Sequence, residues 1–244
     1  MKNIFDDETF FNGYKKIREG EHNYNNLIEQ PAIKSLLPSI QNKKIVDLGC
    51  GYGGNCKEFV LEGAKKVTGI DISEKMLEVA INENFDEKIE YINLDMQEIN
   101  VLQDKYDLVF SSLAFHYVKD FQLLIKKIYN LLNKDGVLLF SQEHPITTAP
   151  KIGPTWTKDS ENRKIFFNLC DYMKNGERRT KWLIDDIEKY HRTISELINI
   201  LINENFIIEK IVEPIPNEKT LEVASWLDDE LEKPTAIIIK ARKR

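Results

Sequence analysis

Short apolar runs alternate with amphipathic stretches along most of the chain, and this rhythm predicts the fold. Five short apolar or β-branched runs are typical of buried strands, and they occupy residues 44–48, 66–70, 89–93, 106–110 and 136–140. Stretches with apolar residues at helical spacing lie between several of them, over about 55–62, 73–82 and 120–133. Strands that alternate with helices predict a parallel sheet with helices on both faces and right-handed crossovers.

The rhythm breaks after residue 141. Residues 144–190 contain prolines, two tryptophans and other aromatic residues, and Asn175-Gly176 separates two strand-like runs at 164–173 and 178–184. Because Asn-Gly between strands is a strong hairpin signal, we predict a β-hairpin that turns there. We interpret 144–190 as an insertion that covers one end of the sheet.

The alternation resumes after the insertion. The pattern predicts a helix at about 193–204, a strand at 206–213 and a final strand at 235–241. The connection between these last two strands has room for one short helix, so the last strand is expected to be antiparallel. The chain is therefore predicted to form a Rossmann-like, doubly wound α/β fold with a seven-stranded, mostly parallel sheet.

This pattern also suggests a domain organisation. Residues 1–40 carry apolar residues at helical spacing and are expected to form an N-terminal helical cap. Residues 41–143 and 191–244 would form the core, and the insertion at 144–190 would be a substrate lid.

Composition and charge exclude several classes of protein. The chain has 244 residues, of which 42% are hydrophobic, and a net charge of −6. An acidic chain lacks the basic footprint of a nucleic-acid binder, and no run of 18 apolar residues predicts a membrane span. Three sparse cysteines favour a reducing, cytoplasmic setting over a disulfide framework. No Cys/His spacing resembles a zinc site, so no metal is expected.

The most informative segment is residues 45–54, IVDLGCGYGG. A strand runs through Asp47, and glycines follow before a helix. Glycines let backbone N–H groups approach a ligand closely. Asp71 closes the next strand, where a carboxylate can accept hydrogen bonds from both ribose hydroxyls of a nucleoside. Polar side chains that follow parallel strands meet at one edge of the sheet, and here these are Asp47, Asp71, Asp95, Ser111 and Ser112.

Two classes of ligand fit this glycine-rich turn. Gly49, Gly51 and Gly54 satisfy the spacing of the dinucleotide-binding fingerprint. Asp47 argues against it, because a carboxylate repels bound phosphates and attracts an α-amino group. S-adenosylmethionine has an ammonium and a sulfonium but no phosphate. A nicotinamide-dependent reductase is the less favoured alternative, also because the chain lacks a Tyr-x-x-x-Lys pair in the expected region.

Five ordered motifs resemble the class I S-adenosylmethionine-dependent methyltransferases. They are VDLGCGYGG, VTGIDIS, INLDMQEI, YDLVFSSLAFHYVKD and LLNKDGVLLFSQEHP, over residues 46–145. The chain is most similar to small-molecule methyltransferases of the ubiquinone-biosynthesis type, known as methyltransferase type 11. This resemblance implies in-line methyl transfer from S-adenosylmethionine to a small-molecule acceptor, by a monomer or homodimer. A non-catalytic S-adenosylmethionine binder is the second alternative.

The resemblance also assigns cofactor contacts. Asp47 and the backbone at Gly49 and Gly51 would hold the methionine moiety, and Asp71 the ribose. Ile72, Asp95 and Met96 would surround the adenine, and Ser112 would line the methionine side. Tyr14 and Arg18 would fold over the cofactor, with Arg18 pairing with the methionine carboxylate. Other readings stay open, since Asp95 can be a helix N-cap, Tyr14 ordinary packing and Arg18 a surface cation.

The acceptor side is assigned from position alone. His116 follows the fourth strand and Glu143 and His144 follow the fifth, so all three are expected to face the acceptor as candidate catalytic groups. Trp182, His191 and Arg192 are candidate substrate-binding residues of the insertion and its return. Arg192 could bind an anionic acceptor, although a role in fastening the insertion is favoured.

Overall fold

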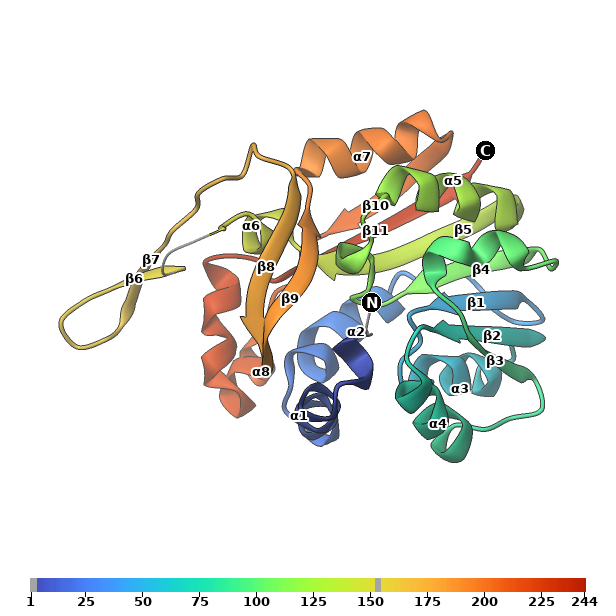
Figure 1. Ribbon diagram of the computed structural model, residues 1–244, viewed down its shortest axis with the longest axis horizontal. Helices are drawn as coiled ribbons and strands as arrows, with labels where there is room; N and C mark the ends of the chain where they lie inside the picture. The colour runs from blue at the N-terminus through green and yellow to red at the C-terminus, as the bar shows by residue number, and fades with distance from the viewer. Residues whose placement is uncertain (1–3, 152–154) are drawn as a thin grey trace.

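The computed structural model describes residues 4–151 and 155–244 and is built around a seven-stranded sheet with the order β10-β11-β5-β4-β1-β2-β3 (Figure 1). Its strands are β1 Lys44–Leu48, β2 Lys66–Asp71, β3 Ile89–Asn93, β4 Tyr106–Ser111, β5 Leu132–Glu143, β10 Phe206–Val212 and β11 Ala236–Lys243. Strands β1 to β5 pair in parallel, and β11 is antiparallel to both of its neighbours. The predicted fold class and the antiparallel last strand are therefore confirmed.

Helices cover both faces of this sheet, as the alternation predicted (Figure 1). The main ones are α3 Gly54–Leu61, α4 Glu74–Glu83, α5 Phe121–Leu131 and α7 Ile194–Asn203. One apolar core lies between the sheet and α5 and α7, and a second lies on the opposite face beneath α3. Ser73, Asp120 and Thr193 start α4, α5 and α7, because each side chain accepts a hydrogen bond from a first-turn N–H.

The N-terminal segment is helical. It comprises η1 Ile4–Asp6, α1 Glu8–Glu19, the π-helix η2 Asn25–Glu29 and α2 Gln30–Lys34. Short helical turns also follow three strands of the core, namely η3 Met96–Val101, η4 Phe115–Tyr117 and α6 Pro145–Thr148. These turns and the N-terminal segment surround the carboxyl ends of the parallel strands.

The insertion contains two hairpins, and the predicted turn is wrong. Strands β6 Trp156–Lys158 and β7 Lys164–Phe167 pair with each other, and β8 Gly176–Trp182 pairs with β9 Ile184–His191. Asn175-Gly176 does not form the turn of either hairpin. Gly176, at φ 111°, opens β8, and the second hairpin turns at Leu183, at φ 58°. The run at 164–167 pairs with the strand before it, which the local sequence did not indicate.

The tip of the β8–β9 hairpin meets the N-terminal helix. A Cβ added at Gly13 in α1 would lie 2.9 Å from Cδ2 of Leu183, so the absence of a side chain at Gly13 allows this close approach. Figure 1 shows the hairpin beside the carboxyl ends of the strands and directed toward α1. The insertion and the N-terminal segment therefore cover the same edge of the sheet.

The connection between β10 and β11 holds two short helices where the sequence indicated room for one. These are α8 Glu218–Val223 and the 3-10 helix η5 Ser225–Leu231. No helix among residues 4–151 and 155–244 is long and apolar enough to cross a membrane. The proposed domain boundaries stay a prediction, and residues 1–3 and 152–154 of those ranges lie outside the described residues.

Candidate functional site

The glycine-rich turn after β1 is anchored to β2. The N–H groups of Gly49 and Cys50 both donate to the carbonyl of Ile70, at 2.8 and 2.9 Å. Gly49 and Gly51 have φ values of 77° and 53°, in the left-handed region that favours glycine. A Cβ at Gly49 would lie 2.7 Å from the Cβ of Ala114, whereas a Cβ at Gly51 would meet nothing within 4 Å. The space above Gly51 is therefore open to a ligand.

Asp71 ties the two strand-end loops together. Its Oδ2 accepts from the N–H of Gly51 at 2.8 Å, and its Oδ1 accepts from the N–H of Ser73 at 2.9 Å. Burial raises the pKa of this carboxyl, while the two backbone donors lower it. Ile72 next to it is 43% exposed. This loop therefore presents a fixed carboxylate and an apolar surface side by side.

Asp47 is buried at the end of β1. Only 1% of its surface is exposed, its Oδ2 lies 3.6 Å from Sγ of Cys56 in α3, and its Oδ1 has no hydrogen-bond partner among the described residues. Burial, together with smaller contributions from the charges of Asp71 and Glu29, raises the pKa of Asp47 to about 8. A buried acceptor without a donor, among other carboxylates, is complementary to a cation.

Asp95 and Met96 lie at the end of β3. Asp95 is the N-cap of η3, with its Oδ1 accepting from the N–H of Gln97 at 2.8 Å. Asp95 thus caps η3, and its contact with adenine stays a prediction. The Cε of Met96 would lie 3.2 Å from a Cβ at Gly49, so this side chain lies beside the glycine-rich turn.

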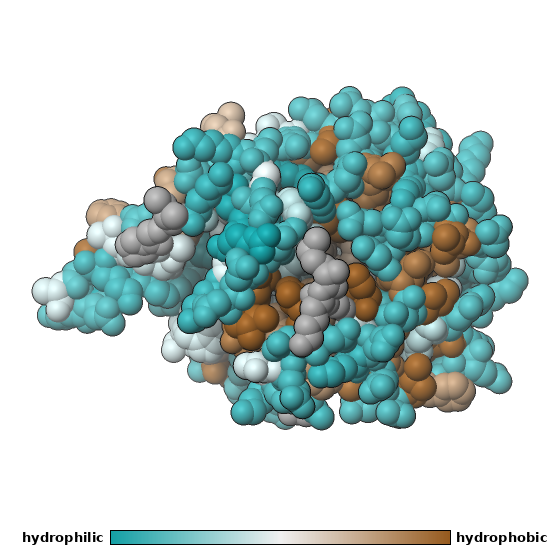
Figure 2. Space-filling model, in the orientation of Figure 1, coloured by the Kyte–Doolittle hydropathy of each residue, from teal (hydrophilic) through white to brown (hydrophobic). Residues whose placement is uncertain are grey.

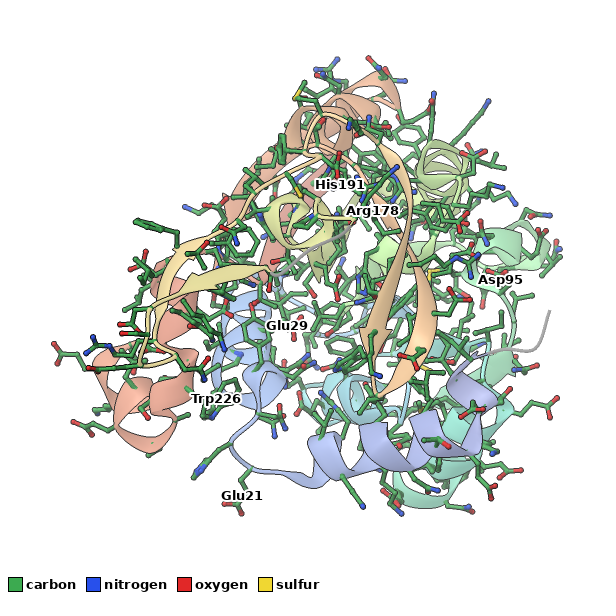
Figure 3. All side chains as sticks on the ribbon, turned by 60° about the vertical axis from the view of Figure 1, so that its left-hand side comes forward. Glu21, Glu29, Asp95, Arg178, His191 and Trp226 are labelled. Atoms are coloured by element: carbon green, nitrogen blue, oxygen red, sulfur yellow. The ribbon has the colours of Figure 1, made fainter. Side chains whose placement is uncertain are left out.

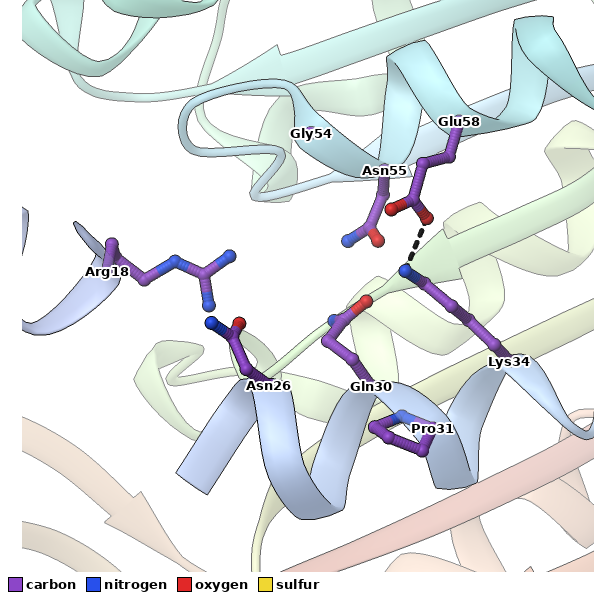
Figure 4. A pocket seen from close by; sticks show the side chains of 8 residues that line it. All are labelled: Arg18, Asn26, Gln30, Pro31, Lys34, Gly54, Asn55 and Glu58. Atoms are coloured by element: carbon purple, nitrogen blue, oxygen red, sulfur yellow. Dashed lines mark ion pairs between the residues drawn. The ribbon is translucent and has the colours of Figure 1, made fainter. Parts of the chain in front are cut away.

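A pocket of about 300 Å³ adjoins the glycine-rich turn (Figure 4). Its lining is Arg18, Asn26, Gln30, Pro31, Lys34, Gly54, Asn55 and Glu58. It lies between the N-terminal helices and the first turn of α3, and the ion pair between Lys34 and Glu58 forms part of its wall. The guanidinium of Arg18 points toward Asn26 and Gln30, so a positive charge faces this polar pocket.

Glu29 is a site residue that the sequence interpretation missed. Its side chain is fully buried, its Oε1 accepts from the hydroxyls of Ser112, at 2.9 Å, and Ser141, and its Oε2 accepts from Nε2 of Gln30 at 2.9 Å. Figure 3 shows Glu29 inside the molecule, beside the N-terminal helices. A signal was present, because Glu29 precedes Ile33 by four residues and so shares the apolar face of a helix.

Aromatic side chains cover the neighbouring space. Tyr14 stacks on Phe10 with ring centroids 6.1 Å apart, and the ring of Trp182 packs edge-on against both, at 6.2 and 5.6 Å. Burial raises the pKa of Tyr14. In Figure 2, hydrophobic side chains gather at the end of the β8–β9 hairpin that approaches α1. Tyr14 and Trp182 therefore join α1 to the hairpin at the rim of the site.

His116 is held by the neighbouring strand. It is 2% exposed, and its Nδ1 accepts from the backbone N–H of Glu143 at 3.3 Å. Burial lowers the pKa of His116 to about 4, so the ring is neutral at physiological pH. The side chain of Glu143 forms an ion pair with Lys189 of β9, and its Oε1 lies 3.9 Å from Nε2 of His116. Burial acts to raise the pKa of Glu143, but the charge of Lys189 and its hydrogen bond to this carboxylate outweigh burial and hold the pKa below its ordinary value.

The expectation that His144 faces the same space is wrong. His144 is fully buried and is the N-cap of α6, with its Nδ1 accepting from the N–H of Ile146 at 3.1 Å. Its other ring nitrogen lies 2.9 Å from Oε1 of Glu213, which follows edge strand β10. One ring nitrogen thus caps α6 and the other contacts the residue that follows β10.

His191 and Arg192 fasten the insertion. The Nδ1 of His191 lies 2.8 Å from Oγ1 of Thr148, and its Nε2 lies 2.8 Å from the carbonyl of Tyr172. Nη2 of Arg192 donates to the carbonyls of Val118 and Lys119, so this side chain ties β9 to the loop after β4. The fastening role favoured for Arg192 is confirmed, and the contacts of both residues differ from the substrate-binding role expected of them.

Arg178 is a third residue that holds the insertion in place, and the sequence interpretation missed it. It is 2% exposed, and its guanidinium donates to several backbone carbonyls, including those of Ala149 at 2.8 Å and Lys174 at 2.6 Å. Figure 3 places it near His191. No group of three or more His, Cys, Asp or Glu in the described part of the chain could hold a metal ion.

Comparison with known proteins agrees with this geometry. The model of a methyltransferase domain matches residues 46–140. A solved S-adenosylmethionine-dependent methyltransferase of Mesorhizobium loti is 38% identical, with a TM-score of 0.82, over 88% of this chain and 97% of that one. A solved structure from Listeria monocytogenes, assigned to the same class, is 35% identical with a TM-score of 0.83, over 88% and 96% of the two chains.

A relative with a more specific name also matches. The ubiquinone biosynthesis O-methyltransferase of Pelagibacter ubique is 30% identical over 78% of this chain and 76% of its own length. The glycine-rich turn, the carboxylates that follow β1 and β2, and similarity over nearly the whole length of solved relatives lead to one assignment. The chain belongs to the S-adenosylmethionine-dependent methyltransferases.

Proposed function

We propose that the protein transfers the methyl group of S-adenosylmethionine to a small molecule bound beneath the β8–β9 hairpin. The cofactor would lie across the carboxyl ends of β1, β2 and β4. Asp71 would accept from the ribose hydroxyls, and Ile72, Asp95 and Met96 would surround the adenine. The methionine end would lie at the glycine-rich turn and in the pocket that Arg18 lines, where Arg18 pairs with the carboxylate.

The site is complementary to this cofactor in shape and charge. The open space above Gly51 admits a ligand against the backbone, and the unpartnered Oδ1 of Asp47 favours a ligand that carries positive charge. A bound ammonium would favour the ionised form of Asp47, whereas the phosphates of a dinucleotide would disfavour it. The open space above Gly51, next to the fixed carboxylate of Asp71, is the observation that carries the proposal.

The acceptor is proposed to be small because the covering elements leave little room for a macromolecule. The hairpin tip packs on Gly13 of α1, and Trp182 packs on Tyr14 and Phe10. Such an aromatic enclosure excludes water and suits a compact organic acceptor. The relative from Pelagibacter, named for ubiquinone biosynthesis, supports the same class of substrate.

Glu143 is the proposed proton acceptor on this side of the site. When bound, the cofactor supplies an electrophilic methyl group on a sulfonium sulfur. Alignment of the acceptor accounts for much of the rate, and a base is needed where the acceptor atom must lose a proton. Of the three candidates, Glu143 combines an ionised side chain with a position under the hairpin, 20% exposed and paired with Lys189. His116 is proposed to support Glu143 and the wall of this space.

A binding titration followed by an acceptor screen tests the function. S-adenosylhomocysteine should bind the purified protein, and Asp71→Ala should weaken binding by about 1–3 kcal/mol through lost hydrogen bonds to the ribose. NADH is the matched control and should not bind. Tight binding of NADH without S-adenosylhomocysteine would contradict the proposal. Binding without turnover of any acceptor in a broad screen would favour a non-catalytic binder.

A further inference from the structure

Glu29 and Gln30 form a hydrogen-bond network with a fixed direction. Ser112, Ser141 and Gln30 all donate to the carboxyl group of Glu29. Burial raises the pKa of Glu29, and these three donors and the charge of Arg18 oppose the rise. The three donors match the ionised carboxylate, which only accepts hydrogen bonds. The hydroxyl of Ser141 is fixed independently, because its oxygen accepts from the N–H of Leu113 at 2.9 Å. The orientation of each donor thus follows from Glu29.

This direction determines which atom Gln30 presents to the pocket. Its Nε2 donates to Oε2 of Glu29 at 2.9 Å and to Oγ of Ser112 at 3.1 Å. An amide nitrogen has two hydrogens, so both are used. The carbonyl oxygen of Gln30 then points into the pocket, toward the side of Asn55 and Glu58 (Figure 4). The pocket therefore contains a fixed acceptor as well as the donors of Arg18.

An acceptor and a cationic donor in one small pocket are complementary to an amino-acid zwitterion. Arg18 can pair with a carboxylate, and a carbonyl oxygen backed by a buried carboxylate can accept from an ammonium. Glu29 is close enough to Arg18 for the guanidinium charge to act on it. Glu29 is itself fully buried, so it acts on a ligand through Gln30 and Ser112.

We infer that Glu29 is a positioning residue that fixes the amide of Gln30 as the acceptor for the α-ammonium of the methionine moiety. This inference rests on the proposed cofactor site, and it adds the amide of Gln30 as the group that recognises the α-ammonium of the cofactor. Replacing Glu29 by glutamine keeps the shape but introduces hydrogen-bond donors, so Gln30 is no longer held in one orientation. The ammonium then loses a charge-assisted hydrogen bond.

The test compares three ligands that differ only at the amino-acid end. These are S-adenosylhomocysteine, its deaminated analogue and its decarboxylated analogue, each titrated by calorimetry. In Glu29→Gln, the affinity for S-adenosylhomocysteine should fall about tenfold or more, and the affinity for the deaminated analogue should change less than about twofold. Arg18→Gln is the matched control, and its loss should disappear with the decarboxylated analogue instead.

Two further variants distinguish positioning from general structural damage. Gln30→Leu should reproduce the loss of Glu29→Gln, and the double variant should bind no more weakly than Gln30→Leu alone, because both changes remove one interaction. Ser141→Ala removes a hydrogen bond to Glu29 on the side away from Gln30. It should lower the melting temperature without changing the ratio of the two affinities.

Equal losses for S-adenosylhomocysteine and its deaminated analogue in Glu29→Gln would overturn the inference and make Glu29 a structural residue. Additive losses in the double variant would also overturn it. If Glu29→Gln does not fold, Gln30→Leu alone must still discriminate against the ammonium. Failure of the wild-type protein to bind any of the three ligands would instead contradict the proposed function.

Discussion

The strand ends of β1 and β2 and those of β4 and β5 lie along one edge of the sheet but differ in how they use polar residues. At β1 and β2, Asp47 keeps an unpartnered oxygen and Gly51 faces open space. At β4 and β5, the side chains of His116 and His144 are bonded to neighbouring segments. The first pair of strand ends is prepared for a ligand. At the second pair, the two histidines contact the core, and Glu143 and the loop after β4 bind Lys189 and Arg192 of β9 and its end.

The difference follows from what each edge has to support. Short loops connect β1 to α3 and β2 to α4, and backbone N–H groups together with the carboxylate of Asp71 shape them. The ends of β4 and β5 carry the insertion, whose hairpin must be attached across a long stretch of sequence. His191 and Arg192 make this attachment by binding backbone atoms of residues 118, 119 and 172. Polar residues near an active site are therefore not all available to the substrate.

The largest expected effect is a loss of kcat on replacing Glu143, which would distinguish this residue from the structural histidines at the ends of β4 and β5. If Glu143 takes a proton from the acceptor, Glu143→Gln should lower kcat by about 10²–10⁴-fold. His116→Asn, whose amide oxygen can still accept from the N–H of Glu143, should lower it by less than about tenfold. Steady-state kinetics with the acceptor found by screening measure both. A similar loss in the two variants would argue that the whole cluster is structural.

The pH profile separates the same two residues. Because burial lowers the pKa of His116 to about 4, wild-type kcat should show no inflection near the ordinary histidine pKa of about 6.5. A rate that rises through that pH in the wild type and loses the rise in His116→Asn would identify His116 as the base.

The next prediction concerns the buried carboxyl group of Asp47 at the end of β1. Burial raises the pKa of Asp47 from 3.8 to about 8, so unfolding releases a proton between these values. The free energy of unfolding of the cofactor-free protein should then fall by about 1.4 kcal/mol per pH unit as the pH rises toward 8. Asp47→Asn should remove this contribution. Urea unfolding at pH 5, 6, 7 and 8 measures it, and a wild-type-to-variant difference that is constant with pH would contradict the prediction.

The smallest expected effect is a difference in stability between alanine variants of Gly49 and Gly51, the two glycines of the turn after β1. Gly49→Ala should cost about 2–4 kcal/mol of stability, because the new methyl adds a contact with Ala114 to the backbone strain. Gly51→Ala should cost only about 1–2 kcal/mol, since nothing in the protein opposes its methyl group. It should nevertheless weaken binding of S-adenosylhomocysteine. Unchanged affinity in Gly51→Ala would place the cofactor elsewhere.

The sequence by itself predicted the sheet and the position of the glycine-rich turn. Residues 44–48 and 89–93 were predicted as strands with the bounds they have in the structure. Ser73 was predicted as a helix cap and is one. Such features depend on periodicity and on hydrogen bonds within a few residues, so their causes lie in the local sequence.

The tertiary structure decided what the polar side chains at the site do. Glu29 accepts hydrogen bonds from Ser112 and Ser141, which are 83 and 112 residues away in the sequence. His116, after β4, accepts from the N–H of Glu143 at the end of the neighbouring strand β5. The strand at 164–167 pairs with the strand before it, at 156–158, and not with the run after Asn175 as the sequence predicted. The role of such a side chain depends on which distant residue lies within hydrogen-bond distance of it in the folded structure, and on how deeply both residues are buried. Those two quantities are set only when the sheet, the N-terminal helices and the insertion pack together.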